Sequence, residues 1–174
     1  DDEIAHLPVG RTIDLDLAMG RIALIYAAWV LLGDRLDRDR ADLIAAPQHE
    51  VITWVAGRIG SLTPAVPLAR GRPARRMRPH AAALTEYAAE VIDKRRAQPT
   101  GTAPDVLDAL LAARPKGRPL EPELLTSHLL GLLLAGNETT AAALSWALVH
   151  AAAHPQHWDD AADPTNAEHY ITET

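Results

Sequence analysis

The sequence predicts an all-α fold built around one long central helix, at about residues 121–154. Apolar residues make up 48% of the chain and are mostly alanine and leucine, whereas phenylalanine is absent. Alanine and leucine have high helix propensities, so this composition favours helices over sheet. The apolar residues recur with helical periods, and no segment alternates convincingly as a strand would. Between Pro122 and Pro155 no proline interrupts the pattern.

The first predicted helix covers residues 14–33. It begins in an acidic segment at Asp14 and ends at Gly33, as a capped helix does. A second helix is expected at about residues 41–59. Pro47 should bend or break it, because proline removes a backbone hydrogen bond.

Residues 61–79 are predicted to form a loop, since they contain four prolines and one glycine. A helix over residues 80–97 follows and closes on a basic turn, which suits the negative end of the helix dipole. A short helix is expected at residues 105–114, between two prolines. After the long helix, residues 156–162 and 166–174 are also compatible with helix.

The long helix is large for a chain of this size. At 1.5 Å per residue it would be about 50 Å long. A compact globule formed by 174 residues should be only about 40 Å across. The helix should therefore cross the whole body and protrude, as expected in a protein more than twice this size.

Charge and composition narrow the classes of function. The net charge is −6 and the pI is about 5.7, so neither nucleic acid nor an anionic membrane is an expected partner. The acidic N-terminal residues do not resemble a signal sequence. The longest uncharged apolar run, residues 22–33, is too short to span a bilayer. We therefore expect a cytoplasmic protein with no membrane attachment.

One motif in the long helix stands out, the run from Ala135 to Thr140. Gly136 in a helix interior costs about 1 kcal/mol relative to alanine, yet small side chains allow a flat ligand to approach the backbone. Thr139 can turn its hydroxyl back to the carbonyl of Ala135. Glu138 adds an acid, and an acid beside a hydroxyl can relay protons. A bent core helix with a tolerated acid is the alternative interpretation.

Other segments occur in an order that completes a family pattern. They are Leu32-Gly33, residues 104–111, 129–140 and 145–148, His154-Pro155, Asp163-Pro164, and Glu173, at the position where the family begins its Glu-x-x-Arg motif; the sequence ends at Thr174, before the position of the arginine. Together they resemble the central portion of the cytochrome P-450 family, of the soluble bacterial type. The resemblance runs from about the helix before the F–G region to the start of the Glu-x-x-Arg helix. It implies a single partial helical domain over residues 1–174.

The resemblance implies roles for the motif residues. Ala135, Gly136 and Thr140 would bind the haem, and Glu138 and Thr139 would deliver protons to bound dioxygen. Leu132 or Leu133 would face a small hydrophobic substrate. The intact parent would be a monooxygenase that receives electrons from a ferredoxin-type redox partner.

The chain lacks the residue on which that chemistry depends. It contains no cysteine, whereas the family holds its haem iron by a cysteine thiolate that drives the oxygen chemistry. We therefore expect a fragment or truncated relative of a haem-thiolate monooxygenase, unable as it stands to ligate haem by thiolate.

Two other functions remain open. Asp159, Asp160 and Asp163 form an Asp-Asp-x-x-Asp pattern, which in terpene synthases binds Mg²⁺ for prenyl diphosphate chemistry, since carboxylates suit this ion. The alternative for these residues is a solvated acidic turn. A non-catalytic binding remnant is the third possibility for the chain.

Two further groups of residues are candidate binding sites. Five arginines gather between residues 70 and 78, and a solvated loop is the favoured interpretation. Three histidines have the spacing of one helical face, but a proline interrupts it. These groups are Arg70, Arg72, Arg75, Arg76 and Arg78, and His150, His154 and His157.

Overall fold

The computed structural model describes residues 8–60, 71–99 and 104–155, and within them every regular element is helical. This confirms the all-α prediction. The elements are α2 (Leu15–Leu32), α3 (Arg38–Gly60), α4 (Gly71–Ala97), α5 (Val106–Ala112), a 3₁₀ turn (Pro115–Gly117) and α6 (Pro122–Ala153).

Helix α2 has the two caps that the sequence predicts. The Asp14 carboxylate accepts a hydrogen bond from the backbone N–H of Leu17 at 3.2 Å. At the other end Gly33 adopts a left-handed conformation with φ of 60°. The N–H groups of Gly33 and Asp34 bond back to the carbonyls of Trp29 and Ala28, which satisfies groups that a helix end leaves unpaired.

The structure corrects the prediction of a loop over residues 61–79. Helix α4 already begins at Gly71, while residues 61–70 lie outside the described part of the chain. Pro73 lies in the first turn, where the N–H it lacks would have no helical partner in any case. Pro79 lies inside the helix, so one proline there does not end it. Likewise α3 continues through Pro47.

The arginine-rich segment is therefore largely helical. Arg75, Arg76 and Arg78 are exposed on the first half of α4. Their solvation agrees with the prediction, but they belong to a helix and not to a loop.

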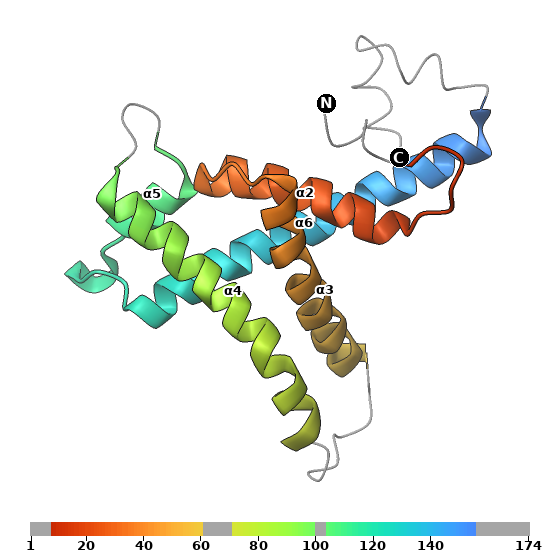
Figure 1. Cartoon of the computed structure of the whole chain (residues 1–174). Coiled ribbons are helices and arrows are strands. Elements are labelled where there is room, and N and C mark those ends of the chain that lie inside the picture. The colour runs from red at the N-terminus through yellow and green to blue at the C-terminus, as the bar shows by residue number, and fades with distance from the viewer. Residues whose placement is uncertain (1–7, 61–70, 100–103, 156–174) are drawn as a thin grey trace.

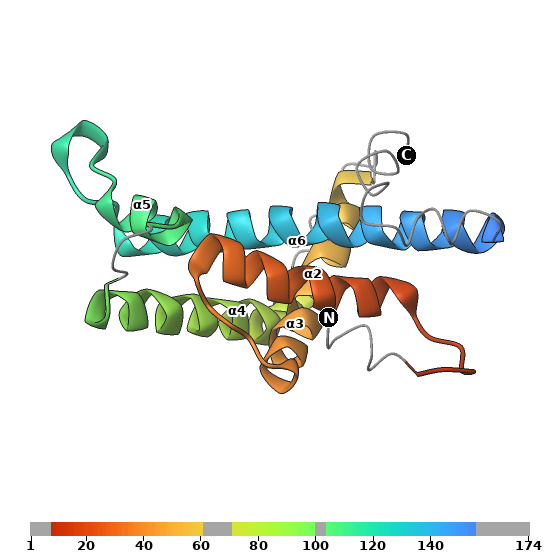
Figure 2. The same ribbon diagram turned by 90° about the horizontal axis from the view of Figure 1, so that it is seen from above.

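Helices α2 and α6 run antiparallel and side by side through the centre of the molecule (Figures 1 and 2). Helix α3 crosses this pair, and α4 packs on α3 and on the first half of α6 (Figure 2). Helix α5 lies where α2 ends and α6 begins (Figure 1). The predicted long helix is thus the shared support of the fold.

The core lies on one side of α6. The buried residues of α6 are Leu125, Leu129, Leu133, Asn137 and Ala141, each four positions after the last. This spacing places them along one slanting stripe of the helix surface. The three leucines of the stripe pack with buried residues of α2, α4 and α5, including Leu24, Leu32, Leu84 and Leu107. Ala141 belongs to a second cluster with buried residues of α2. Between residues 142 and 155 no side chain is buried, so the last part of α6 leaves the core.

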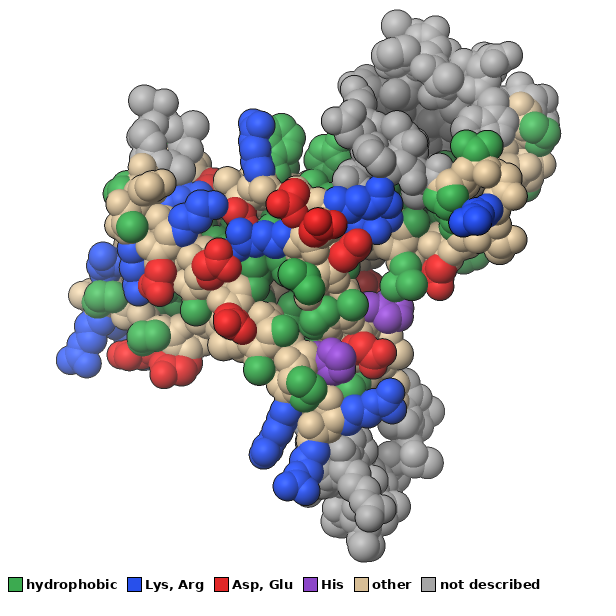
Figure 3. All heavy atoms as spheres, viewed as in Figure 1, with side chains coloured by type: hydrophobic (Ala, Val, Ile, Leu, Met, Phe, Trp, Pro, Cys, Tyr) green, Lys and Arg blue, Asp and Glu red, His purple; other side chains and the backbone are tan. Residues whose placement is uncertain are grey.

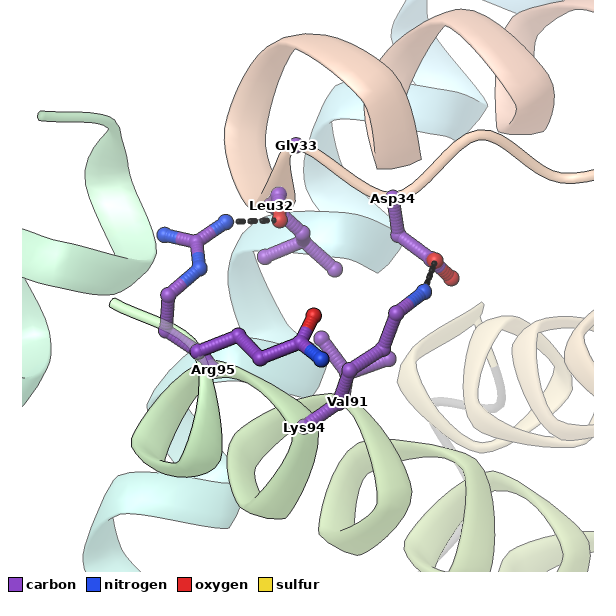
Figure 4. A pocket seen from close by; sticks show the side chains of 7 residues that line it. Leu32, Gly33, Asp34, Val91, Lys94 and Arg95 are labelled. Carbon is purple, nitrogen blue, oxygen red and sulfur yellow. Dashed lines mark hydrogen bonds and ion pairs between the residues drawn. The ribbon is translucent and has the colours of Figure 1, made fainter. Parts of the chain in front are cut away.

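A buried ion-pair junction joins the ends of α2, α4 and α5. Arg95 is 8% exposed and donates to both carboxylate oxygens of Asp105 at 2.7 Å. It also pairs with Asp108 at 2.8 Å. Figure 4 shows its hydrogen bond to the Leu32 carbonyl, which is 2.7 Å long. The hydrogen bonds to Asp105, followed by those to Asp108, raise the pKa of Arg95 above its usual value despite burial. We call Arg95, Asp105, Asp108, Leu32 and Gly33 the Arg95 junction.

A second buried carboxylate lies beside this junction. Asp34 is 4% exposed, and it accepts hydrogen bonds from the Tyr87 hydroxyl at 3.2 Å and from Lys94 at 3.1 Å (Figure 4). Burial, and then the charge of Asp34, raise the pKa of Tyr87 well above its ordinary value. Asp34, like the two carboxylates of the Arg95 junction, therefore has partners.

The surface carries charges of both signs. On the face in Figure 3, basic and acidic side chains are interspersed, as the pairs Arg21–Asp42 and Arg40–Glu90 illustrate. Two helices, α2 and α6, are long and apolar enough to span a membrane by length and composition. This finding differs from the prediction based on residues 22–33, an uncharged apolar run that is too short to span a bilayer. Such helices are weak evidence, because the core helix of a soluble protein passes the same test.

Candidate functional site

Part of the predicted motif lies on the side of α6 opposite the packed stripe. Ala135 and Thr139 are exposed, whereas Asn137 between them is 5% exposed and faces the core. Leu132 and Trp146 are exposed at positions that share the side of Ala135 and Thr139. We call Leu132, Ala135, Thr139 and Trp146 the open face of α6. Its middle has small side chains, so a flat group could approach the helix backbone there.

The hydroxyls of the motif bond to their own helix. Thr139 donates to the carbonyl of Ala135 at 2.8 Å, as the sequence led us to expect, and Thr140 donates to the carbonyl of Gly136 at 2.7 Å. Such bonds from a side chain to the carbonyl four residues earlier locally compete with the helix ladder. The open face therefore presents a hydroxyl that is already aligned along α6.

Gly136 has a different position from its neighbour Ala135. It is partly buried, and a Cβ atom built there would lie 3.3 Å from Cδ1 of Leu31 on α2. The structure gives this glycine a packing role between two helices. That it also binds haem, like the assignments of Ala135 and Thr140, stays a prediction.

Glu138 is exposed and lies at the edge of a cavity between α2, α3 and α6. The exposed residues Asp16 and His49 also line this cavity, and their side chains approach to 3.8 Å. Two buried amides, Gln48 and Asn137, line its inner part. We call this space the amide cavity. Sequence reasoning missed Gln48, because nothing local distinguishes it from the polar residues around it.

The structure separates two residues between which the sequence could not choose. Leu133 is 1% exposed in the core, whereas Leu132 is 39% exposed on the open face. Of the two, only Leu132 is placed to meet a substrate on that face.

The remaining candidate sites find no support. Asp159, Asp160 and Asp163 lie outside the described residues, as does His157. The rings of His150 and His154 have centroids 4.7 Å apart. Within the described part of the chain, no group of three or more potential metal ligands gathers.

Comparison with known proteins identifies the family. The family model of cytochrome P-450 matches residues 9–162. This chain therefore belongs to the cytochrome P-450 family, whose members are haem monooxygenases. It is also similar to beta-amyrin 11-oxidase of Glycyrrhiza uralensis, with 35% identity over 79 residues. That alignment covers 41% of this chain and only 16% of the relative.

The residues present fit haem on one side only. The open face, with the small Ala135 and the aligned hydroxyl of Thr139, suits the face of a flat macrocycle. The thiolate that the family places on the iron cannot come from these residues, because none of the 174 is a cysteine. The chain thus lacks the cysteine that the family uses as the ligand of the haem iron.

Proposed function

We propose that this chain is the oxygen-activating segment of a haem-thiolate monooxygenase, with the open face of α6 turned toward the haem. The observation that carries the proposal is the placement of Ala135 and Thr139. They are exposed together on a helix whose opposite side is buried at every fourth residue from Leu125 to Ala141. The family match over residues 9–162 supports the same assignment.

In this proposal the residues of the chain hold and move protons. Thr139 holds a proton at its Oγ1 atom and shares it with the carbonyl of Ala135. Glu138, at the preceding position, is exposed and can exchange protons with solvent. Haem, when bound, would supply dioxygen activation, and its thiolate ligand is absent from these residues.

Substrate, partner and location follow from the family and are part of the proposal. A small hydrophobic substrate would approach along Leu132, and a ferredoxin-type redox partner would supply electrons to the parent enzyme. A cytoplasmic location is proposed from composition. The assignment to the soluble bacterial type receives no support from the relative in Glycyrrhiza uralensis.

A chimera tests the proposal. Residues 9–162 replace the matching segment of an active cytochrome P-450 that supplies the cysteine. We expect the chimera to bind haem, with the absorption spectrum of a thiolate-ligated iron after reduction and addition of carbon monoxide. In the chimera, Thr139→Ala should lower product formed per dioxygen consumed by roughly 10- to 100-fold, since positioned proton transfer contributes at least this much.

The matched control is Thr85→Ala on α4. Thr85 makes the same kind of bond, donating to the carbonyl of Ala81 at 2.8 Å, but lies on another helix. Its substitution should leave the coupling of oxygen to product unchanged. Equal coupling in the Thr139 variant and the parent chimera would remove Thr139 from the proposed role.

A further inference from the structure

Two buried amides in the amide cavity have polar atoms without partners. Gln48 on α3 is 1% exposed, and neither its amide nitrogen nor its amide oxygen has a hydrogen-bond partner within the described structure. Asn137 on α6 is 5% exposed, and its Oδ1 atom is likewise unpartnered. Buried polar groups are nearly always hydrogen-bonded, so three such atoms beside one cavity require an explanation.

A direct bond between the two amides does not satisfy all three atoms. If the Gln48 nitrogen donated to Asn137 Oδ1, the oxygen of Gln48 would still lack a donor. Exchanging the nitrogen and oxygen of either amide leaves the same deficit. A third group that both donates and accepts is needed.

The cavity has room for such a group. Its volume is about 30 Å³, and about 10–15 Å³ is enough for one water molecule. A buried water usually makes about three hydrogen bonds, and the three unpartnered atoms offer one donor group and two acceptors. Volume and polarity therefore agree on the same occupant.

We propose that Gln48 and Asn137 bind an internal water molecule that links α3 to α6. Asn137 directly precedes Glu138, so the water fixes the turn of α6 from which this carboxylate projects. The two amides act as positioning residues for that turn. This inference does not depend on haem or on the proposed monooxygenase function.

Oxygen-17 relaxation dispersion of the full 174-residue chain tests the proposal, because it counts long-lived internal waters. We expect the parent chain to hold one more such water than Gln48→Met, which keeps side-chain length and removes the amide. The matched control is Gln98→Met, which alters an exposed glutamine and should retain the water. Equal water counts in the parent and in Gln48→Met overturn the proposal.

Stability provides an independent readout. Gln48→Met and Asn137→Leu should each lower the folding equilibrium constant about tenfold, because each leaves the other amide without a partner. The double variant should lose much less than the product of the two, since it removes the whole polar group at once. Strictly multiplicative losses would contradict a shared water.

A crystal structure of the parent chain decides the matter if a variant fails to fold. Electron density for a water within hydrogen-bonding distance of both amides supports the proposal. An amide pair in direct contact, with no water between them, refutes it.

Discussion

The Arg95 junction and the amide cavity are both polar, both buried and both placed where three helices meet. They differ in whether their buried polar atoms have hydrogen-bond partners. In the junction, Arg95 contacts two carboxylates and a backbone carbonyl, all within 2.8 Å. In the amide cavity, Gln48 and Asn137 have atoms that no described protein group satisfies. The comparison indicates that the protein closes its structural junction internally and leaves a polar opening beside the motif of α6.

This difference fits the positions of the two regions. The junction fixes the end of α2 to α4 and α5, away from Glu138 and Thr139. The cavity lies between α2, α3 and α6 and touches Glu138 directly. Departures from full satisfaction of buried groups are expected near functional sites, and the cavity follows that rule.

We expect the largest loss of stability from Arg95→Met in the Arg95 junction. The substitution leaves Asp105, Asp108 and the Leu32 carbonyl without their cation, and breaking a buried pair in this way costs about 3–5 kcal/mol. Urea unfolding should show this loss. The neighbouring Arg96→Met is the control: Arg96 is exposed and lies 3.8 Å from Asp93, so it should change stability by less than about 1 kcal/mol.

Gly33→Ala should also destabilise the Arg95 junction, because Gly33 has a left-handed backbone conformation and lies close to Arg95. Gly33 has φ of 60°, and a Cβ atom there would lie 2.7 Å from the Arg95 guanidinium and 2.9 Å from Asp105. We expect a loss of about 2–3 kcal/mol from the left-handed backbone and the overlap together. The control Gly131→Ala lies in α6 with open space around its Cβ and should instead stabilise by about 0.5–1 kcal/mol.

A sharper test removes only part of that effect. In a chain that already carries Arg95→Met, the guanidinium overlap no longer exists. Gly33→Ala should then cost less than in the parent, because contacting residues do not contribute additively. Equal costs in both backgrounds would show that the overlap with the Arg95 guanidinium contributes nothing to the cost of Gly33→Ala.

Because Tyr87 donates a hydrogen bond to the buried Asp34, we expect folding stability to depend on pH in the alkaline range. The pKa of Tyr87 is raised, chiefly by burial and then by Asp34, whereas a tyrosine in the unfolded chain ionises near pH 10. The contribution of Tyr87 is thus complete below about pH 10. Above that pH the unfolded chain releases the proton first, so stability falls as pH rises.

Tyr87→Phe should flatten this alkaline fall while costing about 1 kcal/mol at neutral pH through the lost hydrogen bond to Asp34. Unfolding free energies measured from pH 8 to pH 11 give the slope for each chain. Tyr26→Phe, at an exposed tyrosine, serves as the reference. A slope for Tyr87→Phe equal to that of the parent would mean that other groups cause the alkaline loss.

The smallest expected effect concerns the open face. Thr139→Ala should change stability by no more than about 0.5 kcal/mol, since alanine is the better helix former and the lost hydrogen bond is local. Thermal unfolding of Thr139→Ala and Thr85→Ala should give similar shifts. A large loss at Thr139 alone would mark it as structural and weaken its assignment to chemistry.

The fold could be predicted wherever the signals are local. Asp14 and Gly33 indicate the ends of α2. The helical pattern without proline after Pro122 indicates α6. The first half of α4 could not be predicted, because Pro73 and Pro79 are typical of loops and only their positions within the helix make them tolerable. Whether a proline ends a helix depends on which turn it occupies, and the sequence does not state this before the helix start is known.

The candidate site was predictable only in part. The motif at Ala135 to Thr140 is contiguous, so its residue types and family resemblance are legible in the chain. The sequence placed Arg95 in a basic helix end and did not indicate its burial, because its partners Asp105 and Asp108 are recruited from another helix. Gln48 and Asn137 are separated by about half of the chain, and only packing brings them to one cavity.

The four-residue spacing of the buried stripe on α6 has a consequence for insertions and deletions. Each residue turns the helix by about 100°, so Ala135 and Thr139, two positions from Asn137, lie about 160° from it. Inserting one residue between Leu133 and Ala135 would rotate every later side chain by that same 100° relative to the anchored part of α6. The chain therefore tolerates changes of residue type on the open face more readily than any change of length upstream of it.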